Sequence, residues 1–279
     1  MRRWLEFLCC ALLLVVPFCV AQKCSPELSH NRSLCQLEIK ARAGDADAQY
    51  DLGLAFDKAL AVDRDCTAAV KWYTQAANRA HVAAQNNLAV LYATGCGVTR
   101  NEVEAAKWYL RSAAAGFVVA QNNIGYAYET GRGVKQSDEA AVHWYREASN
   151  QNYAPGLANL ASHYMSGRGV AKNEAEAARL ERVAAEQGFP AAEAAVGKMY
   201  LIGWQVEKNE AMAAQWFLRA AEHGDLPAQN AFGELIERGV GVPQNRVEAQ
   251  RWYAKAAAAG LQTAQANLDR LNKSLIAER

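Results

Sequence analysis

Histidine, cysteine and serine are the residue types in this sequence whose spacing could support catalysis or metal binding. A zinc peptidase needs His-Glu-x-x-His, and a serine hydrolase or β-lactamase needs Gly-x-Ser-x-Gly or Ser-x-x-Lys. None of these strings occurs, and no Cys-x-x-Cys pair is present for zinc. The Gly131-Arg132-Gly133 turn lacks the Lys-Ser/Thr of a phosphate loop. The sequence therefore predicts no enzyme, no cofactor and no metal site.

The N-terminus has the pattern of an export signal. The basic segment Met1-Arg2-Arg3 precedes an apolar stretch over residues 8–20, and Cys19-Val20-Ala21 supplies small residues for cleavage. The stretch is shorter than the roughly 20 residues that a membrane-spanning helix needs. We expect cleavage after Ala21, with an uncleaved anchor as the alternative. The mature chain is then periplasmic or secreted and has no membrane span.

Cleavage would leave four cysteines in the mature chain: Cys24, Cys35, Cys66 and Cys96. An even number of cysteines in an exported protein predicts two disulfides, for which three pairings are possible. We favour Cys24 with Cys35 and Cys66 with Cys96, which would link the N-terminal end of the folded chain. A metal site is the rival interpretation of these four residues.

The charge balance argues against a polyanionic partner. The chain has 30 Lys and Arg against 29 Asp and Glu, and removal of the signal segment would leave no net charge. Proteins that bind nucleic acid concentrate positive charge on one surface. Nucleic acid is therefore not an expected partner, whereas the hydrophobic content of 51% is ample for a folded core. We expect the protein to be a monomer.

A period of 36 residues organises the chain. Tryptophans recur at this spacing without any insertion, and Leu180 occupies the one vacant position. The series comprises Trp72, Trp108, Trp144, Trp216 and Trp252. Such a period predicts an architecture of stacked identical units. The units also provide an internal comparison of fixed and variable columns.

Each unit contains two helical patterns. In the first, Ala84, Leu88 and Tyr92 form one apolar stripe, and a Gly-x-Gly-Val turn ends the helix. The second helix, which carries the tryptophan, starts at a column of N-cap residues: Asp65, Asn101, Ser137, Asn173, Asn209 and Asn245. The predicted fold class is all-α, a right-handed α/α superhelical solenoid of 36-residue helical hairpins with buried tryptophans.

Four segments follow from this pattern. We expect a signal peptide over residues 1–21 and an N-terminal segment over 22–43, in which residues 29–43 form a solitary capping helix. Six repeats then span residues 44–259, and residues 260–279 form a C-terminal capping helix.

The string Ala-x-x-x-Leu-Gly-x-x-Tyr-x-x-Gly-x-Gly-Val is matched from Ala120 to Val134, with Ile124 in the leucine position. Together with the following Glu-Ala-x-x-Trp-Tyr pattern, it resembles the Sel1-like repeat, a relative of the tetratricopeptide repeat. The resemblance covers residues 44–271. It implies a protein-interaction scaffold whose first helices line the concave side. Some family members are adaptors in the eukaryotic secretory pathway.

The resemblance also carries an enzymatic alternative. Some secreted, cysteine-rich relatives of this repeat are described as binding or hydrolysing β-lactams. This chain resembles them in its export signal and its repeat, but it lacks their cysteine pair in every unit. A β-lactam-binding or β-lactamase-like enzyme is therefore the alternative to a non-enzymatic scaffold.

Columns opposite the apolar stripe of the first helices vary between units, and we expect them to contact a protein or peptide partner. The predicted contact residues are Asn86, Val90, Asn122, Tyr126, Glu129, Ser162, Lys198, Trp204 and Glu234. A groove of amides, aromatic rings and scattered charges suits an extended peptide or a helix. Ordinary solvated surface is the alternative.

The fourth and fifth repeats depart most from the template. Leu180-Glu181 replaces Trp-Tyr, and Trp204 occurs in a turn where other repeats have small or basic residues. Trp204 is either a contact residue of high binding energy or a filler for the space left by the missing tryptophan. Among the histidines, His143 shares an exposed basic column, and His163 takes the position of a packed leucine.

Overall fold

The computed structural model describes residues 24–277, which contain one short 3-10 turn, Pro26–Leu28, and fourteen α-helices but no strand. The predicted signal peptide over residues 1–21, with its cleavage after Ala21, lies outside the described residues. Within residues 24–277, no helix is long and apolar enough to cross a membrane.

The helices alternate between two types along the chain. The first helix of each hairpin, called an A helix below, is one of α2 (Ala46–Lys58), α4 (Val82–Thr94), α6 (Val118–Thr130), α8 (Ala154–Ser166), α10 (Pro190–Ile202), α12 (Leu226–Arg238) and α14 (Gln262–Ala277). The B helices are α1 (Arg32–Arg42), α3 (Cys66–Asn78), α5 (Glu102–Ala114), α7 (Asp138–Asn150), α9 (Glu174–Glu186), α11 (Glu210–Glu222) and α13 (Arg246–Ala258).

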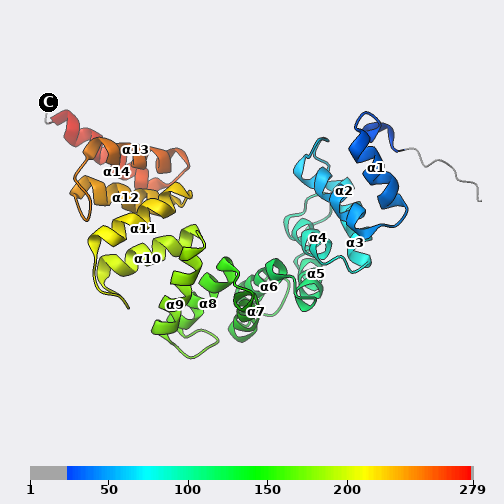
Figure 1. Cartoon of the computed structure of the whole chain (residues 1–279), viewed down its shortest axis with the longest axis horizontal. Coiled ribbons are helices and arrows are strands. Elements are labelled where there is room, and N and C mark those ends of the chain that lie inside the picture. The colour runs from blue at the N-terminus through cyan, green and yellow to red at the C-terminus, as the bar shows by residue number, and fades with distance from the viewer. Residues whose placement is uncertain (1–23, 278–279) are drawn as a thin grey trace, which may run out of the picture. The chain divides into compact units, whose positions relative to one another are not determined.

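The helices form two compact units, residues 24–101 and residues 102–277. In the first unit α1 packs on α2, α2 on α3 and α3 on α4. In the second, each helix from α5 to α14 packs on the next, as the green-to-red ribbon of Figure 1 shows. The all-α fold of consecutive helical hairpins is therefore confirmed within each unit.

Side-chain caps start the B helices as predicted. Asp65, Ser137, Asn173, Asn209 and Asn245 each accept a hydrogen bond from a backbone amide in the first turn. Such caps satisfy amides that have no partner within the helix. The N-terminal capping helix α1 is shorter than expected, because its cap is Asn31 and not Ser29: Oδ1 of Asn31 accepts from the amide of Leu34 at 3.1 Å.

The cores consist of fixed small and aromatic columns. Tyr73, Tyr145 and Tyr253 on the B helices are fully buried. The expectation that all five tryptophans are buried is only partly correct. Trp72 and Trp108 are 6% and 7% exposed, whereas the tryptophans of α7, α11 and α13 are half-buried. Basic side chains lie over four of the five indole rings: Lys71 over Trp72, Arg111 over Trp108, Arg219 over Trp216 and Lys255 over Trp252.

Both favoured disulfides are present, and both lie in the first unit. Cys24 pairs with Cys35 beside α1, with Cα atoms 5.1 Å apart. Cys66, the first residue of α3, pairs with Cys96 in the turn after α4, with Cα atoms 5.4 Å apart. The second disulfide therefore ties the end of one A helix to the start of the preceding B helix.

Candidate interaction surface

One variable column is exposed on four successive A helices of the second unit. Tyr126 on α6 is 45% exposed, and Ser162, Lys198 and Glu234 occupy the same position on α8, α10 and α12. The apolar column two residues earlier is buried at every one of these helices: Ile124, Leu160, Val196 and Phe232. In the first unit the equivalent residue, Val90 on α4, is 36% exposed. Fixed positions thus build the core, and the variable column faces outward.

The amide column behaves differently from the prediction. Asn86 is only 5% exposed, so its expected exposure is wrong, and Asn122 is half-buried. The carboxamide oxygen of Asn122 on α6 accepts from Nδ2 of Asn159 on α8 at 2.9 Å. The same bond recurs between α12 and α14, from Nδ2 of Asn267 to Asn230. Asparagines of this column therefore link neighbouring A helices.

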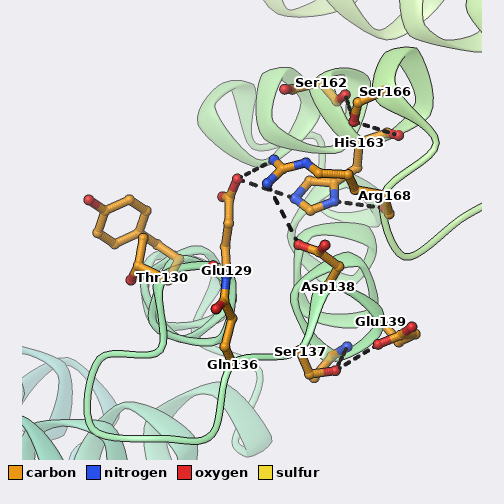
Figure 2. Close-up of polar contacts among 12 residues, drawn as sticks. Glu129, Thr130, Gln136, Ser137, Asp138, Glu139, Ser162, His163, Ser166 and Arg168 are labelled. Atoms are coloured by element: carbon orange, nitrogen blue, oxygen red, sulfur yellow. Dashed lines mark hydrogen bonds and ion pairs between the residues drawn. The ribbon is translucent and has the colours of Figure 1, made fainter.

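Glu129, a predicted contact residue, belongs to a polar cluster between α6, α7 and α8 (Figure 2). Its Oε2 accepts from the hydroxyl of Tyr145 at 2.8 Å, and its Oε1 pairs with the guanidinium of Arg168 at 2.5 Å. Figure 2 shows Glu129 pointing toward His163 and Arg168, and Arg168 also reaching Asp138. Glu129 therefore holds helices together as well as lying near the variable column.

The electrostatics of this cluster favour a permanent carboxylate. Partial burial of Glu129 opposes its ionisation, but hydrogen bonds from Arg168 and Tyr145 outweigh burial and lower the pKa of Glu129. Burial and the neighbouring carboxylate raise the pKa of Tyr145. Tyr145 is thus a fixed donor and Glu129 a fixed acceptor at neutral pH.

His163 is fully buried and packs in the position predicted for it. Its Nδ1 lies 2.9 Å from the backbone oxygen of Arg168, and its Nε2 lies 3.6 Å from Oε1 of Glu129. His143 is exposed on α7, as expected. Across residues 24–277, no group of three or more His, Cys, Asp or Glu side chains is arranged to hold a metal ion.

A cavity lies in the fourth and fifth repeats, where the sequence departs most from the template. This cavity of about 240 Å³ opens between α8, α9 and α10 and is lined by Met165, Glu181, Lys198, Ile202 and Trp204 among others. Lys198, a predicted contact residue, therefore borders a real depression. Trp204 is half-buried, packs against the core cluster that contains Leu180, and donates from Nε1 to Glu174 at 3.3 Å. The indole has the contacts expected of a filler while also forming one wall of the cavity.

The structure brings together side chains that the sequence analysis did not connect. Tyr145 and Arg168 join Glu129, and the same set recurs as Tyr253 and Arg270 around Glu237. A signal was present, because Glu129 and Glu237 each precede the buried tyrosine by the same number of residues. The sequence marks Glu181 only as a departure from the template, and its place beside a cavity depends on how α8, α9 and α10 pack.

Comparison with protein-family models finds six consecutive Sel1 repeats, at residues 46–81, 82–117, 118–153, 154–189, 190–225 and 226–261. No curated protein sequence matches the chain significantly. Among solved structures, the chain is similar to c5321, a protective antigen of uropathogenic Escherichia coli strains with an SLR fold. The TM-score is 0.74 at 32% identity, over 88% of this chain and 52% of the antigen, so the chain spans about half that relative's length.

A Sel1 repeat protein from Oxalobacter formigenes is similar at a TM-score of 0.74 and 30% identity, over 78% of this chain and 89% of the other. The immunity protein Pa5087 from Pseudomonas aeruginosa, at 22% identity and a TM-score of 0.52, covers 76% of this chain and 81% of its own, and shows likeness of fold alone. Six matched repeats and these solenoid neighbours agree with the hairpin architecture described above. The chain belongs to the Sel1 repeat family.

Proposed function

We propose that the protein is a non-enzymatic interaction scaffold that binds a protein or peptide partner through the exposed column of its A helices. Sel1 repeats are generally scaffolds of this kind, which gives the class of function. The supporting observation in this chain is the contrast between the two neighbouring columns. Phe, Val, Leu and Ile fill the buried one, whereas Tyr126, Ser162, Lys198 and Glu234 differ in chemistry on the exposed one.

Variation at exposed positions of a regular scaffold suits recognition, because it leaves the core untouched and changes only what a partner meets. The ring of Tyr126 is already ordered by the guanidinium of Arg132, which lies 5.3 Å from the ring centroid. Glu234 is likewise held, since its Oε1 accepts from Asn230 at 2.8 Å and from Asn267 at 2.9 Å. Ordered side chains lose less conformational freedom on binding.

The proposed setting is the periplasm or the extracellular space, with a monomeric mature chain. Two disulfides in residues 24–101 support an oxidising compartment, because structural disulfides are rare in reducing ones. The basic and apolar N-terminal residues support export with cleavage after Ala21.

The test is affinity capture from the native cell followed by binding measurements with the purified partner. A Tyr126→Ala/Lys198→Ala double variant should lose at least about tenfold in affinity if both residues are contacts. Its melting temperature should stay unchanged, because both side chains are exposed. The matched control is His143→Ala/Arg146→Ala, which also removes one ring and one cation, but from exposed positions on the B helix α7. Equal binding by the two double variants would show that the partner does not use the A-helix column.

A further inference from the structure

The cavity beside Glu181 occurs where the repeat normally places an aromatic ring. In the other five complete repeats the column of Glu181 holds Tyr73, Tyr109, Tyr145, Phe217 and Tyr253. Four of these rings lie against a glycine of an A helix: a Cβ on Gly53, Gly125, Gly197 or Gly233 would come within 2.6–3.0 Å of the ring. The repeat that contains Glu181 has Ala161 in the glycine position, so it lacks both the aromatic ring and the glycine against which that ring packs.

The polar partner of the ring has changed as well. Tyr145 donates to Glu129, and Tyr253 donates to Glu237, each at 2.8 Å. In the altered repeat the carboxyl group stands in the tyrosine column as Glu181, and the acid column holds Met165. This repeat therefore keeps an acid at the site and has lost the phenol that would bind it.

Glu181 has no internal compensation for this loss. Its Oε2 is enclosed by protein and has no hydrogen-bond partner within residues 24–277. Burial raises the pKa of Glu181 to about 7, because an enclosed carboxylate loses its hydration. A buried polar atom without a partner is costly, and native structures contain few of them. The observation points to a group that is supplied from outside.

The volume and lining of the cavity fit one aromatic ring. An engineered protein cavity of about 150 Å³ binds benzene, and this cavity measures about 240 Å³. Met165, Met199 and Trp204 supply polarizable and aromatic walls. Met165 and Ile202 are 46% and 61% exposed, which leaves the mouth open beside the contact residue Lys198.

We propose that this cavity is a recognition pocket for a tyrosine side chain of the partner, with the phenol hydroxyl hydrogen-bonded to Glu181. This inference rests on the proposed function, since the partner supplies the tyrosine. A phenol suits Glu181 in either protonation state, because its hydroxyl both donates and accepts. Lys198 at the rim disfavours a cationic guest, and a carboxylate guest would face the Glu181 carboxyl in an apolar cavity.

The pocket can be tested without knowing the partner, by titrating the full-length mature protein with small probes followed by NMR or calorimetry. p-Cresol, the tyrosine side-chain analogue, should bind with a dissociation constant on the order of 1 mM. Toluene, which lacks the hydroxyl, should bind about tenfold more weakly. N-Acetyl-tyrosinamide should likewise bind better than N-acetyl-phenylalaninamide, which tests entry of a ring that is attached to a backbone.

The Glu181→Leu variant should bind toluene better than p-cresol, because the carboxyl partner is gone. The control is Glu186→Leu, an exposed glutamate on the same helix α9, which should leave both affinities unchanged. Absence of p-cresol binding, equal preference in the wild type and the Glu181→Leu variant, or stronger binding of n-butylammonium than of p-cresol would each overturn the proposal.

These outcomes are separate from the test of the scaffold function. If partner binding depends on Tyr126 and Lys198 but p-cresol does not bind, the scaffold proposal stands and the tyrosine pocket is refuted. If p-cresol binding depends on Glu181 but the partner does not use the A-helix column, the pocket proposal stands and the proposed contact column is refuted.

Discussion

The hydroxyl of Tyr145 donates a 2.8 Å hydrogen bond to Oε2 of Glu129, joining the B helix α7 to the A helix α6. The bond recurs between Tyr253 and Glu237, which lie at the same columns of a later repeat. Where the acid column is Leu201, the aromatic residue is Phe217, and the two side chains pack in one apolar cluster. In these three repeats the ring matches its partner, whereas Tyr109 is kept opposite Ala93; Glu181 with Met165 is the one pair of these columns in which the carboxyl group stands on the B helix.

The Tyr145→Phe variant tests the strength of this bond. It removes a donor from a partly buried carboxylate and should lower the free energy of unfolding by about 2 kcal/mol. The reverse change, Phe217→Tyr, should also destabilise, by about 1–2 kcal/mol, because the new hydroxyl would face the apolar Leu201. Urea denaturation of both variants measures the effects. A stabilising Phe217→Tyr change would contradict the matching of the two columns.

The pH dependence of stability tests the raised pKa of Glu181. Its pKa is about 7 in the folded protein and near the ordinary 4.5 when unfolded, so the native state binds more protons between these values. Stability must therefore fall as pH rises through this range, and the full loss is present above pH 7. The loss amounts to about 1–3 kcal/mol for a group that is partly shielded from solvent.

The Glu181→Gln variant has no proton to lose and should gain stability relative to the wild type as pH rises. Denaturant midpoints at pH 4 and pH 8 make the comparison, with Glu186→Gln on the exposed side of α9 as the control. A difference between wild type and Glu181→Gln that is independent of pH would show that the pKa of Glu181 is the same in the folded and unfolded states.

Much of the fold can be predicted from the sequence, because a comparison of the repeats with one another shows which positions the fold constrains. Columns that hold the same residue type in every unit, such as the caps at Asn173 and Asn209, have the same local role in every unit. The two disulfides agree with the pairing favoured among three possibilities, and His163 is buried as its place in an apolar column predicts.

The candidate site was less predictable. The sequence indicates which face of a helix a side chain lies on, but not which side chains of the neighbouring helix it contacts. Asn86 was expected to face a partner and is buried, while Asn122 is engaged by the next A helix. Glu129 also lies in a variable column, yet its oxygens are held by Tyr145 and Arg168. Such contacts between repeats depend on the stacking geometry, which the spacing of residues does not give.

The disulfide between Cys66 and Cys96 should stabilise the first unit. It closes a loop with a sequence separation of 30 residues. Restricting a loop of that length in the unfolded chain stabilises the native state by about 3–4 kcal/mol in the chain-entropy model. The Cys66→Ser/Cys96→Ser variant should lose protection from hydrogen exchange in α3 and α4.

Peptide mapping of the unreduced protein gives the pairing directly, and Cys24→Ser/Cys35→Ser is the matched comparison near α1. Its smaller separation of 11 residues predicts a smaller loss. A map showing Cys24 joined to Cys66 or Cys96, or four free thiols, would refute both pairings.

Comparison of Gly116 and Gly133 distinguishes the cost of an unusual backbone conformation from the cost of a steric clash. Both have a positive φ, +88° and +70°, which an L side chain rarely adopts. A Cβ at Gly116 would meet nothing within 4 Å, whereas one at Gly133 would collide with the backbone carbonyl of Glu102 at the start of α5. Gly116→Ala should therefore cost about 1 kcal/mol, the strain of the left-handed conformation alone.

Gly133→Ala adds the displacement of a backbone that cannot rotate away, and we expect a loss of about 3 kcal/mol or more. Thermal or urea unfolding of the two variants decides the matter, since the substituted atoms are the same in both. Gln205 occupies the equivalent of Gly133 in a later repeat with a φ of +56°, so a residue with a side chain can adopt the left-handed conformation at this position. Equal losses at Gly116 and Gly133 would mean that the second glycine of the turn serves conformation alone, and that the turn does not need to lie so close to the preceding B helix.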